Sequence, residues 1–353
     1  MKKDEFYMKV AIKNAMKAKG KTGVNPLVGC VIVKNDKIIS IGFHEGPGSP
    51  HAEIKAINSA AENLYNSTIY ITLEPCNLWG RTPPCLETIE QIPFKRIVIG
   101  IEDPNPLVSG KSIKHLIKKK YEVTLGVLKE KVKEMNPYFK NYITKKQTYM
   151  IMKAALTLDG YLNVNENKSK YFTSDKSRIL VHKERFKVDA ILVGANTVNT
   201  DNPILDCRFV NKKYKPSVII LDFSNKVNYS KTIMTDKSRM KYIFISEKFR
   251  KEKREASDLK YIFVKRKENT WKILRYEFHK ENIISIFIEG GADTFKDALK
   301  NRAVDEIQIF YAPLFAGKGK RIEINKFVSS TFILVEHRKI KNDLFASYKC
   351  LQD

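Results

Sequence analysis

With 353 residues, of which 43% are hydrophobic and 29% charged, the chain is too long for one ordinary domain and has the composition of a two-domain globular protein. No apolar run reaches the ~20 residues that a membrane-spanning helix needs, and no apolar secretory stretch follows the polar start, so we expect a cytoplasmic protein with no membrane partner. The formal net charge of +25 could indicate nucleic-acid binding, but lysine is spread along the whole chain, which favours a solvated surface and no nucleic-acid partner.

Helical and extended patterns alternate over the first 145 or so residues. In chain order we expect a helix over 4–19, strands over 28–34 and 38–43, a helix over 51–63, strands over 68–73 and 96–101, a helix over 110–119, a strand over 122–127 and a basic helix over 129–143. Helices between strands are typical of a sheet covered on both faces, so the pattern predicts α/β/α layers.

A second apolar start lies at Tyr149, after a polar segment, and it indicates a domain boundary. We therefore expect one domain over residues 1–145 and another over residues 146–353. The expected strands of the second domain are 149–155, 189–194, 216–221, 241–245, 261–265, 284–288 and 304–311, with a closing pair at 332–336 and 344–351. Its expected helices are 175–186, 271–281 and 292–300.

Three side chains that can bind a metal each follow a proline directly, in Pro50-His51, Pro75-Cys76 and Pro84-Cys85. Proline suits the step from a loop into a helix, so we expect each ligand at or near a helix N-terminus, where the helix dipole favours a thiolate. One imidazole and two thiolates leave the fourth position of a tetrahedral zinc to water, as in a catalytic site. A structural zinc, the alternative, would need a fourth Cys or His at short spacing, and only His44 is near.

The chain has five cysteines, an odd number without a secretory context, which favours metal ligation or burial over disulfides. Glu53 lies two residues after His51, and residues so spaced can converge only at the start of a helix. A carboxylate beside zinc-bound water can take its proton and deliver it to a departing amine. His-x-Glu with a later Pro-Cys is the signature of zinc deaminases, in which the glutamate is acid and base but not a ligand.

The second half has no Gly-x-Gly-x-x-Gly after a strand, so a Rossmann fingerprint is absent. Its most distinctive segment is Ile286–Thr294, in which a strand runs through two glycines into a helix. Glycines there let a phosphate approach the backbone and the helix N-terminus. The same dipeptide is also a common strand-to-helix turn, so this segment alone leaves both interpretations open.

Two groups of segments resemble the bifunctional riboflavin-biosynthesis deaminase/reductases, in the order of that family. The segments similar to the deaminase half, which include an eight-residue spacing between the zinc cysteines, are Asn25–Val33, Gly42–His44, Thr72–Cys76, Gly80–Cys85 and Asp103–Pro106. The segments similar to the reductase half are Lys153–Gly160, Asp189–Gly194, Thr197–Pro203 and Glu289–Gly291. The resemblance implies an α/β fold, with an N-terminal cytidine-deaminase-like α/β/α domain that has a mixed sheet and a C-terminal dihydrofolate-reductase-like α/β domain.

The resemblance also implies Zn²⁺ and NADPH as cofactors and a phosphorylated pyrimidine as the small-molecule substrate. Hydrolytic deamination of a diamino-ribosylamino-pyrimidinone phosphate would be followed by reduction of the ribosyl group to ribityl. In the deaminase half, zinc ligation is implied for His51, Cys76 and Cys85, acid–base catalysis for Glu53, and substrate binding for Asn25, His44 and Arg81. One departure is Asn77-Leu78-Trp79 after the first zinc cysteine, where the family commonly has Ser-His.

In the reductase half, the resemblance implies two sets of residues. Contact with NADPH is implied for Ala155, Tyr171, Thr197, Asp201, Gly290 and Gly291. Contact with the substrate is implied for Lys153, Ser169, Arg185, Leu205, Arg208 and Glu289. Tyr171 stands where the family often has tryptophan, which keeps an aromatic face.

Two alternatives remain at this stage. The first is a nucleic-acid deaminase, acting on tRNA or single-stranded DNA, with the basic second half as a binding module. It does not explain the cysteine spacing or the reductase-like segments. The second is a protein in which one half has lost its activity and serves as a scaffold. We favour the bifunctional enzyme, and we expect it to be a homo-oligomer because deaminases of this class often associate.

Overall fold

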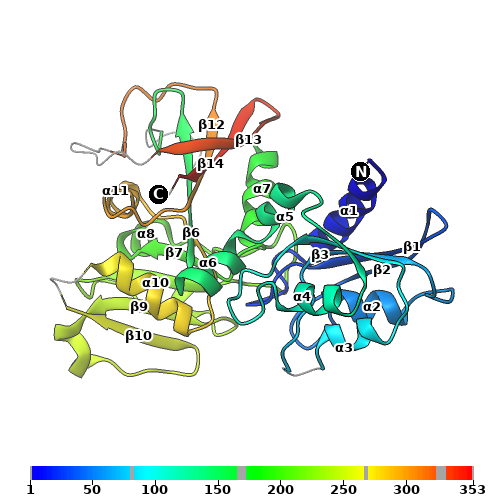
Figure 1. The fold of residues 1–353 in the computed structure, drawn as a ribbon. Coiled ribbons are helices and arrows are strands. Elements are labelled where there is room, and N and C mark those ends of the chain that lie inside the picture. The colour runs from blue at the N-terminus through cyan, green and yellow to red at the C-terminus, as the bar shows by residue number, and fades with distance from the viewer. Residues whose placement is uncertain (1, 80–82, 165–171, 266–268, 323–330, 352–353) are drawn as a thin grey trace. The chain divides into compact units, whose positions relative to one another are not determined.

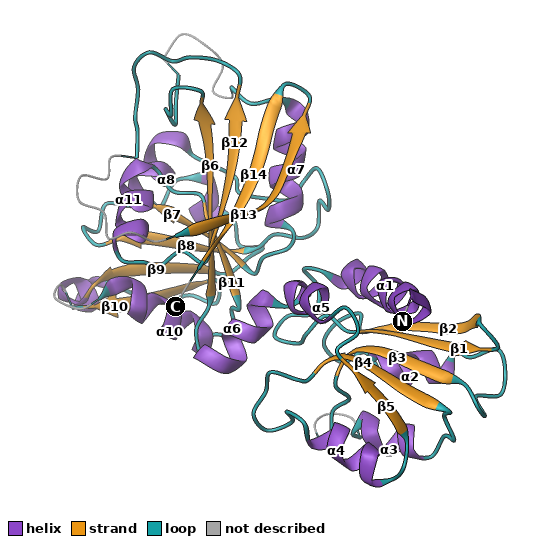
Figure 2. Ribbon diagram, turned by 45° about the horizontal axis from the view of Figure 1, so that its top comes forward, coloured by secondary structure: helices purple, strands orange, loops and turns teal. Residues whose placement is uncertain are grey.

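Two units make up the chain in the computed structural model, Met1–Lys146 and Gln147–Asp353. The structure describes residues 2–79, 83–164, 172–265, 269–322 and 331–351. Each unit has a sheet of its own with helices around it (Figures 1 and 2). No helix within these described ranges is long and apolar enough to cross a membrane.

The first unit is built on a five-stranded sheet in the order β2-β1-β3-β4-β5. Its strands are β1 (Gly29–Lys34), β2 (Lys37–Phe43), β3 (Thr68–Leu73), β4 (Arg96–Ile101) and β5 (Glu122–Leu125). Its helices are α1 (Lys2–Ala15) with the 3₁₀ turn η1 (Met16–Ala18), α2 (Ala52–Asn58), α3 (Cys85–Glu90), α4 (Lys111–Lys118), α5 (Lys129–Met135) and α6 (Pro137–Lys145). β1 pairs antiparallel with β2 and β3, whereas β3, β4 and β5 run parallel, which confirms the expected mixed sheet.

Side chains of the central strands of this sheet alternate between two hydrophobic cores, one on each face. In β1, Cys30 and Ile32 pack with side chains from α2, α3 and α4. Val31 and Val33 point the other way and pack with side chains from α1 and α5. All four are buried, which explains why β1 is a continuous apolar run in the sequence. The expected α/β/α layers are confirmed.

Two expected helices of the first unit were wrong in extent. The helix expected over 129–143 is broken into α5 and α6, because Pro137 begins α6 and disfavours helical geometry at Asn136, whose φ and ψ are −120° and 43°. The helix expected over 51–63 ends at Asn58, where the Ser59 hydroxyl donates to the carbonyl of Lys55 and so competes with the backbone. The structure also gives a short helix α3, whose start at Cys85 agrees with the expected helix start after Pro84, although no helix range was expected there.

The second unit has a nine-stranded sheet in the order β10-β9-β8-β7-β11-β6-β12-β14-β13. Its strands are β6 (Tyr149–Thr157), β7 (Ala190–Gly194), β8 (Ser217–Asp222), β9 (Lys241–Ser246), β10 (Leu259–Val264), β11 (Ser285–Ile288), β12 (Glu306–Ala312), β13 (Phe332–Ile340) and β14 (Asp343–Cys350). Its helices are α7 (Asp175–Arg185), α8 (Ala195–Asp201), α9 (Thr232–Thr235), the 3₁₀ helix η2 (Glu247–Glu252), α10 (Thr270–Lys280) and α11 (Ala292–Lys300). The expected closing pair is present as antiparallel β13 and β14, while α8, α9 and η2 were not expected.

The carboxyl ends of β7 and β11 mark a switch point in the topology of the second unit. These neighbouring strands run parallel, and β7 leads through α8 to β8 on one side of the sheet. β11 leads through α11 to β12 on the other side. In open α/β sheets, ligands bind at the carboxyl ends of strands whose connections diverge in this way. The topology therefore predicts a ligand site beside the N-termini of α8 and α11.

Candidate functional site

His51, Cys76 and Cys85 come together in the first unit. Their ligand atoms all lie within 4.8 Å of one another, with His51 Nδ1 at 3.1 Å from Cys85 Sγ and at 3.5 Å from Cys76 Sγ. Tetrahedral zinc with bonds of about 2.0 Å to nitrogen and about 2.3 Å to sulfur separates its ligand atoms by similar distances. The donor set and its spacing therefore fit a zinc ion.

Helix starts position two of these ligands, but not the third. His51 is the N-cap of α2 and Cys85 is the first residue of α3. The expectation that Cys76 also begins a helix was wrong, because Cys76 lies in a loop after β3. Its sulfur nevertheless accepts the backbone N–H of Cys85 at 3.3 Å, so the N-terminus of α3 reaches both cysteines. A hydrogen bond from the Cys85 thiol lowers the pKa of Cys76, which favours the thiolate that binds metal.

Glu53 is the second residue of α2 and is almost fully buried. Burial raises the pKa of its carboxyl to about 7, and the neighbouring Cys76 sulfur contributes in the same direction. A carboxyl with a pKa near 7 can both accept and donate a proton at neutral pH. Its place at the start of α2 brings this carboxyl close to the candidate metal ligand His51.

His44 and Asn25 lie beside this centre and contact each other. Asn25 Nδ2 is 3.1 Å from His44 Nε2, and the ring centroids of His44 and His51 are 5.6 Å apart. Both nitrogens of His44 have other partners, since Nδ1 lies 3.4 Å from the carbonyl of Pro50. A structural zinc would need a fourth protein ligand, and His44 does not belong to the group of His51, Cys76 and Cys85. Arg81 lies outside the described residues, and Trp79 is 70% exposed.

Glu74 supports the centre and was missed in the sequence. Its buried carboxylate accepts backbone N–H groups from Asp103, Gly110 and Ser112 at 3.2, 2.8 and 3.0 Å. It therefore ties the end of β3, two residues before Cys76, to the loop after β4 and to the start of α4. An acidic residue directly before Pro-Cys was the signal that could have revealed this role.

Lys153, Arg185 and Glu289 form a buried ionic cluster in the second unit. Arg185 binds Glu289 with both Nε and Nη2, at 2.5 and 3.0 Å, and Lys153 Nζ lies 3.5 Å from the same carboxylate. Burial alone would raise the pKa of Glu289, but the two cations outweigh it and lower the pKa to about 2. Burial lowers the pKa of Lys153. The carboxylate is therefore ionised at neutral pH and balances two positive charges.

The loop after α8 brings Leu205 and Arg208 to the same cluster. Arg208 Nη1 donates to Asp206 Oδ1 at 2.8 Å, and Arg185 Nη1 donates to the carbonyl of Asp206 at 3.2 Å. Leu205 is buried and has a positive φ of 50°, in the left-handed region. The sequence did not indicate a role for Asp206, because only its neighbours matched the family.

Gly290 and Gly291 lie between β11 and α11, beside α8. A Cβ atom on Gly290 would come within 2.5 Å of Thr294, so this position accepts no side chain. A Cβ atom on Gly291 would face the hydroxyl of Thr197 at 3.8 Å. The two glycines thus leave backbone N–H groups accessible at the helix start, a geometry that fits the phosphates of NADPH.

The other proposed NADPH residues are only partly covered by the structure. Asp201 ends α8, four residues after Thr197, and Ala155 lies in β6, the strand that pairs with β11. The predictions for Tyr171 and Ser169 fall outside the described residues.

Comparison with known proteins finds a matching family model for each of the two units. The cytidine and deoxycytidylate deaminase zinc-binding region matches residues 1–101, and the RibD C-terminal domain matches residues 148–346. Riboflavin biosynthesis protein RibD of Aquifex aeolicus is 40% identical over 320 residues, which cover 90% of this chain and 89% of the relative. The corresponding protein of Bacillus amyloliquefaciens is 35% identical, over 89% of this chain and 85% of the relative.

Solved structures agree with these relatives. The crystal structure of a diaminohydroxyphosphoribosylaminopyrimidine deaminase/5-amino-6-(5-phosphoribosylamino)uracil reductase from Thermotoga maritima has a TM-score of 0.89 and 33% identity, with 99% of each chain covered. The RibD structure of Acinetobacter baumannii has a TM-score of 0.85 and 28% identity, also with 99% of each chain covered.

Proposed function

This chain belongs to the RibD family, and we propose that its two units act in turn on one phosphorylated pyrimidine. The protein is a bifunctional enzyme of riboflavin biosynthesis that joins a zinc-dependent deaminase to an NADPH-dependent reductase. We assign the deaminase to residues 1–145 and the reductase to residues 146–353, a division supported by the two units and by the matched ranges. The proposed substrate of the first step is a diamino-ribosylamino-pyrimidinone phosphate.

The observation that carries the deaminase assignment is a buried glutamate beside three metal ligands. His51, Cys76 and Cys85 would hold zinc, which supplies a bound water of lowered pKa. Glu53 takes a proton on its carboxylate and donates it to the amine that leaves as ammonia. Its pKa of about 7 suits both directions of this transfer.

Substrate binding in the first unit is assigned to Asn25, His44 and Arg81. The contact between Asn25 and His44 holds two polar groups in place beside the metal ligands. The pKa of His44 is lowered by burial, so its ring is neutral at pH 7 and can donate or accept for a pyrimidine. Arg81 is assigned to the substrate phosphate, which a guanidinium group binds with two hydrogen bonds.

In the second unit, NADPH when bound would supply the hydride that reduces the anomeric carbon of the ribose. Lys153 donates a proton to the sugar oxygen as the ring opens, and the lowered pKa of this lysine makes it a readier donor. Glu289 accepts from ribose hydroxyls and orients Arg185. Arg185 and Arg208 bind the substrate phosphate. Ser169 and Leu205 complete this substrate site, and the proposed NADPH contacts are Ala155, Tyr171, Thr197, Asp201, Gly290 and Gly291.

We further propose that the enzyme is a cytoplasmic homo-oligomer without a nucleic-acid partner. Zinc thiolates persist in a reducing compartment, and the structure has five free cysteines, which supports the cytoplasm. The two small-molecule sites account for the chemistry without a nucleic acid.

A coupled assay tests the proposal. The zinc-loaded protein is mixed with the diamino-ribosylamino-pyrimidinone phosphate and NADPH, and ammonia release and NADPH absorbance are followed together. We expect ammonia first, and NADPH oxidation only after it. Ammonia without NADPH oxidation would contradict the reductase assignment, and the absence of both signals from folded, metal-loaded protein would contradict the whole proposal.

A further inference from the structure

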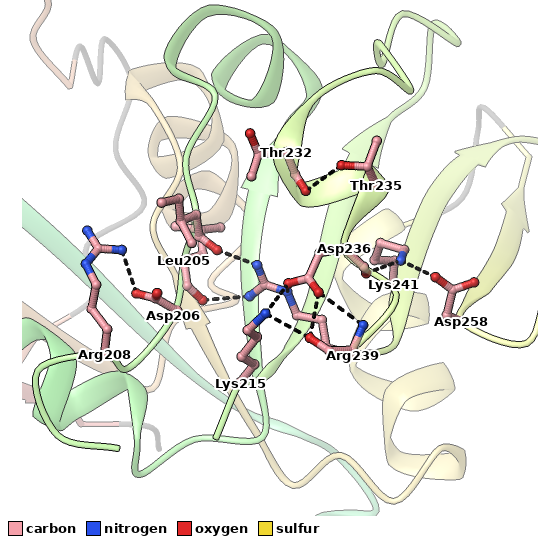
Figure 3. Close-up of polar contacts among 12 residues, drawn as sticks. Leu205, Asp206, Arg208, Lys215, Thr232, Thr235, Asp236, Arg239, Lys241 and Asp258 are labelled. Carbon is pink, nitrogen blue, oxygen red and sulfur yellow. Dashed lines mark hydrogen bonds and ion pairs between the residues drawn. The ribbon is translucent and has the colours of Figure 1, made fainter. Parts of the chain in front are cut away.

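The segment Ile204–Asp206 of the second unit is held by two buried guanidinium groups. Arg239 donates through Nη2 to the carbonyl oxygen of Ile204 and through Nη1 to that of Leu205, the latter at a distance of 2.7 Å. Arg185 donates to the third carbonyl, at 3.2 Å. Figure 3 shows Arg239 reaching from the start of β9 to this segment. Three consecutive carbonyls outside any helix or strand therefore find their partners in side chains.

The backbone of this segment needs such support. Leu205 has a φ of 50° and Asn202, three residues before it, has a φ of 44°. The left-handed conformation is unfavourable for a residue with a side chain, because Cβ then comes too close to the following carbonyl oxygen. It persists only where the surrounding structure holds it. Arg239 donates to the carbonyls of Ile204 and Leu205, which belong to the two peptide groups on either side of the Leu205 Cα atom, and so fixes this turn.

Arg239 is itself held by a network of charged side chains around Asp236. Its side chain is 1% exposed, and its Nε lies 3.3 Å from Asp236 Oδ2. Asp236 also accepts from Lys215 Nζ at 2.8 Å. Lys241, buried as deeply as Arg239, donates to the backbone carbonyl of Asp236 at 2.6 Å (Figure 3). A buried charge needs partners of this kind, and here they leave Arg239 one orientation.

We propose that Arg239 is a positioning residue for the pyrimidine substrate of the reductase. By fixing the turn at Leu205, it sets the place of Leu205 and of Arg208, three residues further along the chain. Within the described residues, the contacts of the Arg239 guanidinium are with the carbonyls of Ile204 and Leu205 and with the carboxylate of Asp236. This inference rests on the proposed function, because Leu205 and Arg208 are substrate residues only if that proposal holds.

The test compares R239Q and R239K with R275Q in the full-length protein. Arg275 is a matched control, since its side chain is 7% exposed and it binds Asp305 in the same unit, away from the segment. Loss of binding to substrate alone raises KM and leaves kcat unchanged. For R239Q we expect the KM for the deaminated pyrimidine phosphate to rise about 10-fold, with kcat, the KM for NADPH and ammonia release within about 2-fold of wild type.

R239K keeps the charge but can bridge fewer carbonyls, so we expect an intermediate KM, and R275Q should leave KM unchanged. Equal rises in KM for R239Q and R275Q, or a joint change in kcat and in the KM for NADPH, would overturn the proposal. If R239Q does not fold, the comparison is made between R239K and R275Q. The proposal then requires R239K to raise the KM for the pyrimidine substrate, with kcat and the KM for NADPH unchanged, and R275Q to leave that KM unchanged. Hydrogen exchange of the amides at 202–208 provides a separate measurement, and R239K must speed it while R275Q does not. If wild type itself fails to oxidise NADPH with this substrate, the proposed function is wrong, whereas the exchange result still tests the positioning.

Discussion

The proposed zinc ligands of the first unit come from three short segments that each begin with a proline, whereas the ionic cluster of the second unit joins side chains up to 136 residues apart. In the first unit, one histidine and two cysteines, the donor set of a zinc site, lie within 4.8 Å of one another. In the second unit, Glu289 balances Arg185 and Lys153 directly. The first site should therefore respond to changes in metal and proton transfer, and the second to changes in ion pairing.

The largest expected effect is that of E53Q on the first unit. The amide keeps the shape of the side chain but cannot carry the proton, so ammonia release should fall by roughly 10²–10⁴-fold. Zinc content and NADPH oxidation with pre-deaminated substrate should stay at the wild-type level. The control is E87Q on α3, where the glutamate is exposed. Full ammonia release by E53Q would show that the proton carrier was misassigned.

E289Q should lower the reductase activity of the second unit and leave the deaminase activity of the first unit unchanged. The variant leaves the charges of Arg185 and Lys153 buried without their carboxylate, which costs about 3–5 kcal/mol when one partner of a buried pair is removed. We expect NADPH oxidation on pre-deaminated substrate to fall about 100-fold, which equals a barrier increase of about 2.7 kcal/mol. Ammonia release serves as the internal measurement. The control is E277Q on α10, where the glutamate forms a partly exposed ion pair with Lys280. A parallel loss of ammonia release would contradict separate sites.

A pH effect of intermediate size is expected at His182 of the second unit. Burial lowers the pKa of this imidazole to about 4, from an ordinary value of 6.5, and the nearby Arg185 acts in the same direction. Since the folded protein binds the proton less well than the unfolded chain, stability is fully present above pH 6.5 and is lost as the pH falls towards 4.

The measurement is the midpoint of urea unfolding between pH 7 and pH 4, followed by fluorescence of Trp271. This tryptophan is buried in the second unit, whereas Trp79 is 70% exposed and should change little. H182N removes the titrating group, so its free energy of unfolding should fall less than that of wild type over this range, by about 1 kcal/mol or more. Identical pH dependence in the two proteins would rule out His182 as the cause.

The smallest effect is expected for C30A in the first unit. Cys30 lies in the hydrophobic core of β1 and does not belong to the group of metal ligands. C30A should keep its zinc and its ammonia release and lose only about 1 kcal/mol of stability, the cost of a small cavity. C85A is the matched variant, and metal analysis should show that it loses zinc. Zinc loss from C30A would mean that the ligand set has been drawn wrongly.

Much of the first unit and of its site could be predicted from local patterns. The candidate metal ligands could be recognised because each follows a proline. Glu53 could be recognised because it lies two residues after His51, a spacing at which the two side chains converge only at the start of a helix. The helix expected over 129–143 is wrong for an equally local reason, since Pro137 interrupts it. Glu74 was missed because its partners, the N–H groups before α4, are remote in sequence.

The sequence by itself determined the chemistry that each half could perform, because ligand spacing and glycine turns are constraints within a few residues. Only the tertiary structure decided which charges act together. Among 64 lysines and arginines, Arg239 has no distinguishing neighbour in the sequence. In the folded chain, Arg239 lies just before β9 and next to the loop after α8. There its side chain is buried between the carboxylate of Asp236 and two backbone carbonyls. A buried charge is stable only with its partners, and long-range folding alone determines those partners.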